Sequence, residues 1–160
     1  MILLGLGSNM GDRLQTLKMA MEEMEKYSIQ ILRCASFYET PAWGITQQNT
    51  FINTVCSIQY QGKPVELLDI CQEIEQTFGR KRILTWGPRT LDIDILEFEG
   101  IHLQTDRLQI PHPYYLKRAF VMIPLSEMAP DYLPTGQNQT VLKLAEQFRE
   151  ELGSIKKLPA

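Results

Sequence analysis

The sequence lacks the features of a membrane protein and of a general nucleic-acid binder. It has no apolar run of about 18 residues, which a membrane span would need, and no basic leader before its first apolar stretch. Its net charge of -3 and its pI near 5.4 exclude a broad basic surface for nucleic acids or anionic membranes. We therefore expect a cytoplasmic protein that binds neither membranes nor nucleic acid.

Cysteine is also scarce. The three cysteines, Cys34, Cys56 and Cys71, lie in apolar stretches and show no CxxC spacing. An odd number without a spacing pattern is typical of thiols in a reducing compartment rather than of a disulfide framework or a metal site. We expect all of them to be buried thiols.

Three nucleotide-binding signatures are missing or incomplete. There is no G-x-x-x-x-G-K-[ST] motif and no HRD or DFG set, which excludes P-loop enzymes and protein kinases. Gly5-Leu6-Gly7 lacks the third glycine of a dinucleotide-binding fingerprint. Any nucleotide site must therefore be built from other residues.

The hydrophobic pattern predicts one domain over residues 1–160, without repeats or linkers. Strands are expected at 2–6, 29–39, 51–60 and 91–98, with a short hairpin from 101–103 and 107–110. Helices are expected after Asp12, from Pro64 to Phe78, at 124–128 and at 141–152. Strands that alternate with helices, together with a hairpin, predict an α+β layer fold with a largely antiparallel sheet.

Two aspartates carry the strongest chemical signal. Asp92 and Asp94 are two residues apart in an expected strand, so their carboxylates share one face, while Leu91, Ile93 and Ile95 face the other side. Two neighbouring carboxylates repel each other unless a cation lies between them, and their hard oxygens suit Mg²⁺. A solvated strand face is the alternative, but the surrounding apolar residues favour a central strand.

A basic cluster precedes this strand. Arg80, Lys81, Arg82 and Arg89 lie within a short stretch of chain, and guanidinium groups match phosphate oxygens in both geometry and charge. The alternative is a solvated run of charge. The position of the basic cluster between an expected helix and the double-aspartate strand favours a phosphate-binding loop. His112 and Arg118 are further polar candidates.

An aromatic residue and an amide share a face of another strand. Phe51, Asn53 and Val55 alternate along the expected strand. A phenyl ring can stack on a flat heterocycle, and an amide can donate to and accept from its edge. The alternative is a core phenylalanine beside a strand asparagine.

Read together, these segments resemble the 6-hydroxymethyl-7,8-dihydropterin pyrophosphokinase family (2-amino-4-hydroxy-6-hydroxymethyldihydropteridine diphosphokinases). The motifs that carry the resemblance are Gly7-Ser8-Asn9, Phe37-Tyr38-Glu39-Thr40-Pro41, Phe51-Ile52-Asn53, Gly79-Arg80-Lys81-Arg82, Trp86-Gly87-Pro88-Arg89-Thr90-Leu91-Asp92-Ile93-Asp94-Ile95, Pro111-His112-Pro113 and Arg118-Ala119-Phe120. The resemblance covers nearly the whole chain, and the run from Trp86 to Ile95 is highly specific. Thr85 departs from the family, whose members often carry a basic residue there, and Trp43 is bulkier than the residue expected at its position.

The resemblance implies a three-layer αβα sandwich around a ferredoxin-like, mainly antiparallel sheet. It implies a monomeric enzyme that transfers pyrophosphate from ATP to the hydroxymethyl group of the dihydropterin. Two Mg²⁺ ions would be held by Asp92 and Asp94. The implied pterin site is Thr40, Pro41, Trp43, Phe51, Asn53, Asp92 and Phe120. The implied ATP site is Gln72, Glu75, Arg80, Arg82, Trp86, Arg89, Ile95, Arg107, His112 and Arg118, and the implied catalytic residues are Arg82, Arg89, Asp92 and Asp94.

A function of another class remains open from the sequence. A non-catalytic ferredoxin-like module could use Phe51 and Phe120 as a stacking platform for single-stranded nucleic acid. The acidic pI and the aspartate pair argue against it, because carboxylates repel phosphates in the absence of a cation.

Overall fold

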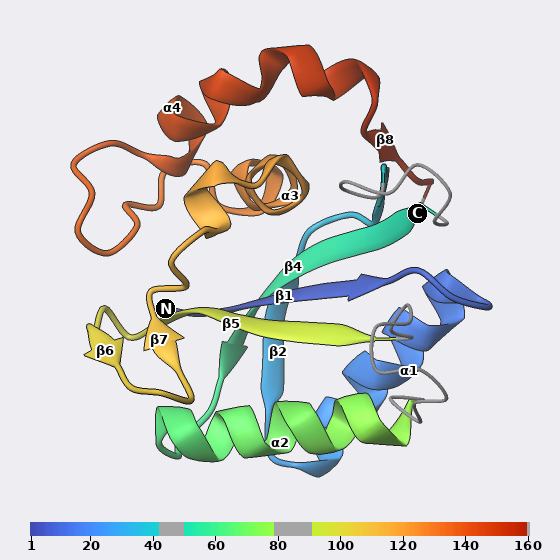
Figure 1. Cartoon of the computed structure of the whole chain (residues 1–160), viewed down its shortest axis with the longest axis vertical. Helices are drawn as coiled ribbons and strands as arrows, with labels where there is room; N and C mark the ends of the chain where they lie inside the picture. The colour runs from blue at the N-terminus through green and yellow to red at the C-terminus, as the bar shows by residue number, and fades with distance from the viewer. Residues whose placement is uncertain (42–49, 79–90, 160) are drawn as a thin grey trace.

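A computed structural model describes residues 1–41, 50–78 and 91–159 of the chain, and its sheet lies between two layers of helices (Figure 1). The strands of the main sheet are β1 (Ile2–Ser8), β2 (Gln30–Cys34), β3 (Tyr38–Thr40), β4 (Phe51–Gln59), β5 (Asp92–Phe98) and β8 (Lys156–Lys157). A separate hairpin consists of β6 (Leu103–Gln104) and β7 (Gln109–Ile110). The helices are α1 (Arg13–Lys26), α2 (Pro64–Thr77), α3 (Ala119–Met128) and α4 (Val141–Ala145), with 3-10 helices η1 (Tyr115–Lys117) and η2 (Glu146–Gly153).

The sheet is antiparallel, in the order β5-β1-β4-β3-β8, and β2 also pairs with β4. The long strands β1, β4 and β5 are buried along most of their length, because helices cover both faces of the sheet. The strand of Asp92 and Asp94 was expected to be central, but β5 lies at the end of the strand order and is shielded by the helix layers instead of by a second neighbouring strand. The predicted α+β sandwich with a mainly antiparallel sheet is confirmed.

Helices α1 and α2 cover one face of the sheet. Asp12 caps α1 by accepting a hydrogen bond from the backbone N–H of Gln15 at 3.1 Å, and Pro64 occupies the first turn of α2. Apolar residues at helical spacing on both helices meet even-numbered residues of β1 and β4, such as Leu4 and Cys56, and Ile93 and Ile95 of β5. This face of the sheet is therefore filled by a hydrophobic core.

The opposite face is covered by α3, α4 and the 3-10 helices. Odd-numbered residues of β1 and β4, such as Leu3 and Val55, pack against these elements in a second core, together with Leu96 of β5. Helix α3 begins at Ala119, earlier than expected, and contains Pro124 in its interior. Most of its side chains are buried, and this burial offsets the hydrogen bond that proline cannot donate.

One expected strand is divided in two. Between the pairs Cys34↔Cys56 and Tyr38↔Asn53, residues 35–37 lie opposite residues 54–55. Three residues opposite two constitute a bulge, which shifts the alternation of side chains by one position. As a result, Thr40 lies on the same face as its partner Phe51.

Other expectations need correction. Cys34 lies on β2 and is exposed, whereas Cys56 and Cys71 are buried as expected. The last helix is not continuous, because α4 gives way to a 3-10 helix with a kink at Phe148. Strand β8 lacked a sequence signal because it is only two residues long and gains its partner β3 from far along the chain. In the described part of the chain, no helix is both long and apolar enough to cross a membrane.

Candidate active site

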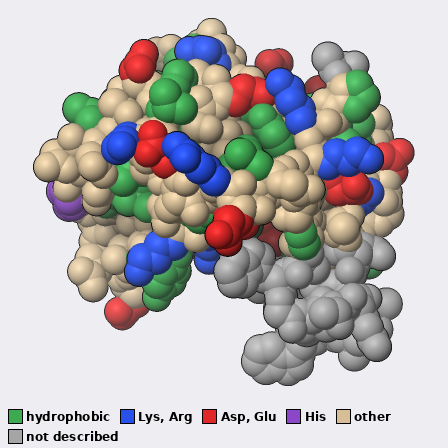
Figure 2. Space-filling view, turned by 90° about the horizontal axis from the view of Figure 1, so that it is seen from above, with side chains coloured by type: hydrophobic (Ala, Val, Ile, Leu, Met, Phe, Trp, Pro, Cys, Tyr) green, Lys and Arg blue, Asp and Glu red, His purple; other side chains and the backbone are tan. Residues whose placement is uncertain are grey.

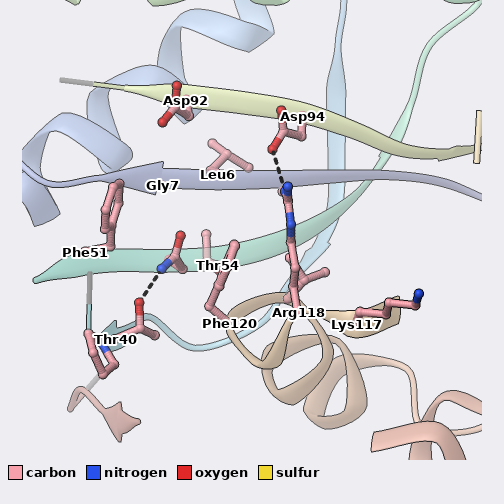
Figure 3. A pocket seen from close by; sticks show the side chains of 14 residues that line it. Leu6, Gly7, Thr40, Phe51, Thr54, Asp92, Asp94, Lys117, Arg118 and Phe120 are labelled. Atoms are coloured by element: carbon pink, nitrogen blue, oxygen red, sulfur yellow. Dashed lines mark hydrogen bonds and ion pairs between the residues drawn. The ribbon is translucent and has the colours of Figure 1, made fainter. Parts of the chain in front are cut away.

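A cavity of about 450 Å³ lies between the sheet and the start of α3 (Figure 3). Its volume is within the range of small-molecule sites. Its lining residues are Gly5, Leu6, Gly7, Thr40, Pro41, Phe51, Asn53, Thr54, Asp92, Asp94, Lys117, Arg118, Phe120 and Val121. The cavity therefore brings together the expected aspartate pair and all of the expected pterin residues that the structure describes.

The floor of the cavity is a row of residues across three strands. Gly7 on β1 lies opposite Asn53 on β4 and opposite Asp92 on β5. Directly opposed residues share a face of a sheet, so the amide and the carboxylate flank a position that has no side chain. This arrangement leaves room for a flat molecule above Gly7.

Gly7 is required by a close approach. A Cβ atom at this position would lie 2.5 Å from Asn53 Oδ1. The Asn53 side chain cannot move away freely, because its Nδ2 donates a hydrogen bond to Thr40 Oγ1 at 2.7 Å in a buried environment. Glycine at position 7 therefore allows the Asn53 amide to hold a fixed orientation at the cavity.

The two aspartates project from β5 on the cavity side. Both are half-buried, and Gly5 lies opposite Asp94 as Gly7 lies opposite Asp92. The Arg118 guanidinium approaches Asp94, with Nη1 and Oδ2 3.9 Å apart. Hard carboxylate oxygens side by side at the edge of an open cavity form a donor set that suits Mg²⁺, which completes its shell with phosphate oxygens and water.

Aromatic side chains line the cavity from two elements. Phe51 comes from β4, and Phe120 comes from the first turn of α3. The Arg118 guanidinium carbon lies 5.6 Å from the centre of the Phe120 ring and 6.0 Å from that of Tyr114. Arg118 thus links the aspartate side of the cavity to its aromatic side.

Arg13 connects the strands on which the cavity residues lie. Its Nη1 donates to Thr50 O at 2.8 Å and to Thr50 Oγ1 at 2.6 Å, and its Nη2 donates to Glu39 Oε2 at 2.9 Å. Hydrogen bonds from Arg13 and Thr50 lower the pKa of Glu39. Glu39 directly precedes Thr40 and Thr50 directly precedes Phe51, so this bridge fixes the spacing of two cavity residues.

The expected ATP residues are spread more widely. Arg118 lines the cavity, whereas Gln72, Glu75, Ile95, Arg107 and His112 are not among its lining residues. Arg107 Nη2 donates to Asp69 Oδ1 at 2.7 Å and to Gln72 Oε1 at 3.3 Å. Burial and the charge of Arg118 lower the pKa of His112 to about 4, so its imidazole is neutral at pH 7.

Two of the expected ATP residues, Glu75 and Ile95, stabilise the fold around β5. The buried Glu75 carboxylate accepts a hydrogen bond from the backbone N–H of Ile93 at 2.9 Å. It therefore holds β5 between the two aspartates. The Ile95 side chain is buried in the core beneath α1 and α2. Trp43, Arg80, Arg82, Trp86 and Arg89 lie outside the described residues.

The sequence did not identify Gly7, Lys117 or Arg13 as site residues. A glycine inside a strand is a signal for close backbone approach, so Gly7 was detectable in principle. Arg13 was not, because its partners Glu39 and Thr50 are distant in the sequence.

Comparisons with known proteins show the family of the chain. The sequence model of the 7,8-dihydro-6-hydroxymethylpterin-pyrophosphokinase (HPPK) family matches residues 3–130. The 2-amino-4-hydroxy-6-hydroxymethyldihydropteridine pyrophosphokinase of Methylorubrum extorquens is 42% identical over 135 residues, which are 84% of this chain and 85% of the relative. The protein of the same name from Bacillus subtilis is 39% identical over 126 residues, which are 78% of this chain and 75% of the relative.

Solved structures share the fold. The wild-type HPPK-DHPS of Plasmodium falciparum with pteroate superposes with a TM-score of 0.79 at 16% identity, covering 99% of this chain and 48% of that one. This chain therefore spans about half the length of that larger protein. The family match covers most of the chain and includes every described cavity residue, and so the chain belongs to the HPPK family.

Proposed function

We propose that this chain transfers the pyrophosphate group of ATP to the hydroxymethyl group of 6-hydroxymethyl-7,8-dihydropterin, in a step of folate biosynthesis. The products are the pterin diphosphate and AMP, because attack falls on the β-phosphorus. The observation that carries the proposal is the row Asp92–Gly7–Asn53, which places a carboxylate and a fixed amide on either side of one open position. Family membership supplies the reaction class.

The pterin would lie flat in the cavity. Phe51 and Phe120 would stack on its ring, and the Asn53 amide would exchange hydrogen bonds with its edge. Thr40 holds that amide in place through the bond at 2.7 Å. Burial of these polar partners favours a ring that satisfies them over one that does not. Trp43 stays a predicted member of this site from the sequence.

Asp92 and Asp94 would hold two Mg²⁺ ions. When bound, these ions would neutralise charge on the phosphates and on the reacting oxygens. The chain itself would align the acceptor hydroxyl with the β-phosphorus. Asp92, which lies next to the expected pterin position, would accept the hydroxyl proton, and Arg118 would balance charge beside Asp94.

Other phosphate contacts rest on the sequence alone. Arg82 and Arg89 are proposed catalytic contacts to the transferring phosphates, and the remaining predicted ATP residues would hold the nucleotide. We also propose that the enzyme acts as a monomer in the cytoplasm, where the cysteine pattern of the sequence would suit the reducing conditions.

An assay of AMP release from ATP tests the proposed reaction. We expect AMP formation that depends on both added hydroxymethyl-dihydropterin and Mg²⁺, with one pterin diphosphate formed for each AMP. Formation of ADP, or AMP formation that is independent of the pterin, would refute the proposal.

The nucleic-acid alternative is not favoured. Figure 2 shows basic and acidic side chains interspersed over the face that it displays. A nucleic-acid module needs an excess of basic side chains in a stripe or patch, whereas this chain has a net charge of -3. Thermal shift separates the two functions: the enzyme should be stabilised by a non-hydrolysable ATP analogue with Mg²⁺, and a nucleic-acid module by oligonucleotides without it.

Replacing Gly7 by alanine should weaken pterin binding. The new methyl group would displace the Asn53 amide from Thr40 and from the ring edge. We expect about a tenfold rise in the pterin Kd, the equivalent of roughly one well-made hydrogen bond, with little change for ATP. Gly5→Ala is the matched control, because a Cβ there would meet Leu96 at an ordinary 3.5 Å. An unchanged pterin Kd in Gly7→Ala would show that the Asn53 amide does not hydrogen-bond to the pterin.

Replacing Arg13 by glutamine should raise the pterin KM with little change in kcat. The variant loses the bridge from Glu39 to Thr50, so the strands that carry Thr40 and Phe51 are no longer held at one spacing. A partly buried charged bridge is worth about 1 kcal/mol, which corresponds to a KM about fivefold higher. Lys26→Gln breaks an exposed ion pair with Glu23 elsewhere on α1 and is expected to leave KM unchanged. If Arg13→Gln lowers Tm but not pterin affinity, the bridge is only structural.

A further inference from the structure

Two of the cysteines face each other across neighbouring strands. Cys34 on β2 is the register partner of Cys56 on β4, and their Sγ atoms are 2.6 Å apart. The next backbone N–H, that of Ala35, donates to Val55 O at 2.9 Å. Hydrogen-bonded and non-hydrogen-bonded pairs alternate along an antiparallel ladder, so Cys34 and Cys56 form a non-hydrogen-bonded pair. Such pairs have Cα atoms about 4.5 Å apart, a separation that a disulfide can span.

The two thiols differ in access and in acidity. Cys34 is exposed at the surface, whereas Cys56 is buried in the core beneath α1 and α2. The hydrogen bond between the two thiols lowers the pKa of Cys34, and the same bond together with burial raises the pKa of Cys56. Cys34 is thus the thiol that a dissolved oxidant reaches first, and Cys56 is the partner within reach of it.

We propose that Cys34 and Cys56 form a reversible disulfide when the protein meets hydrogen peroxide. The Cys34 thiolate attacks the peroxide, which breaks the O–O bond and gives the Cys34 sulfenic acid and hydroxide. The Cys56 sulfur then attacks the Cys34 sulfur, forms the S–S bond and expels hydroxide, which takes up the Cys56 proton. Altogether, two thiols and one peroxide give one disulfide and two waters.

This disulfide would clamp the part of the chain that carries the pterin wall. The segment between the two cysteines includes Thr40, Phe51 and Asn53, so the bond would close a covalent ring around it. Among the described strands, β2 pairs only with β4, and the bond would tie it there. Cys56 packs on the face of the sheet that α1 and α2 cover, whereas the cavity lies on the face toward α3. The clamp would therefore stabilise the fold without blocking the cavity.

Thiol counting in the whole protein tests the chemistry. Reduced protein, alkylated in denaturant, should carry three alkyl groups, and peroxide-treated protein should carry one, on Cys71. Dithiothreitol should restore the full count. Cys34→Ser should keep both of its thiols through the treatment, because Cys56 and Cys71 are buried. Cys56→Ser should gain oxygen atoms on Cys34, since the sulfenic acid has no partner.

Outcomes of another kind would overturn the proposal. The proposal is wrong if peroxide-treated wild type keeps all of its thiols. It is also wrong if Cys34 gains oxygen without a cross-link, or if the disulfide forms between two molecules. The clamp has its own readout: the Tm of oxidised wild type should exceed that of reduced protein by about 5–10 °C. Cys71→Ser should show the same rise in Tm on oxidation, and Cys34→Ser should show no rise. The pterin Kd of oxidised wild type should stay within about twofold of that of the reduced protein. No rise in wild type, or loss of pterin binding on oxidation, would refute the clamp.

Discussion

Replacing Asp94 by asparagine should reduce the rate of the chemical step by on the order of 100-fold or more. The substitution keeps the size of the side chain but removes the negative charge of a proposed metal ligand. It also leaves the Arg118 guanidinium, 3.9 Å away, without its opposite charge. The loss should therefore fall on the transition state more than on ATP binding. Single-turnover kinetics at saturating substrates measure it.

The neighbouring aspartate and a remote one serve as comparisons. Asp92→Asn should show a similar loss with added weakening of pterin binding, because Asp92 shares the row with Gly7 and Asn53. Asp131→Asn changes an exposed carboxylate outside the cavity and should leave the rate unchanged. A rate in Asp94→Asn within a few-fold of wild type would remove the metal pair from the mechanism.

Replacing Phe51 by alanine should weaken pterin binding by about 1–3 kcal/mol, or roughly 5- to 150-fold in Kd. The variant removes one aromatic surface of the cavity and leaves Asp92, Asp94 and Arg118 in place. Affinity for an ATP analogue with Mg²⁺ should change little. Isothermal titration of each ligand separates the two effects.

Two further variants distinguish stacking from folding. Phe51→Tyr retains the ring and should bind pterin almost as tightly as wild type. Phe37→Ala removes a partly buried ring that packs on the core outside the cavity, so it should lower Tm but not pterin affinity. Equal weakening of both ligands in Phe51→Ala would indicate a folding defect rather than a lost stacking contact.

The sequence predicted those parts of the site that lie within one strand. Asp92 with Asp94 and Phe51 with Asn53 share a face because side chains alternate along a strand, a rule that holds whatever the strand pairs with. The helices after Asp12 and at Pro64 were equally local, because each begins at a residue that favours a helix start.

Features that depend on pairing were beyond the sequence. The bulge at 35–37 places Thr40 beside Phe51, yet nothing within the run from Ile29 to Glu39 marks it. The Arg13 bridge likewise depends on partners in two other elements. In α3, Pro124 predicted a helix start, and burial of the whole element overrode that local preference.

The most direct test of the account is a crystal structure of the protein with hydroxymethyl-dihydropterin, a non-hydrolysable ATP analogue and Mn²⁺ in place of Mg²⁺. Anomalous difference density locates the manganese ions independently of the protein. We predict two peaks bound by the Asp92 and Asp94 carboxylates, with the pterin ring between Phe51 and Phe120 and its edge at Asn53. Metal peaks away from these aspartates, or a pterin ring outside the cavity, would contradict the account.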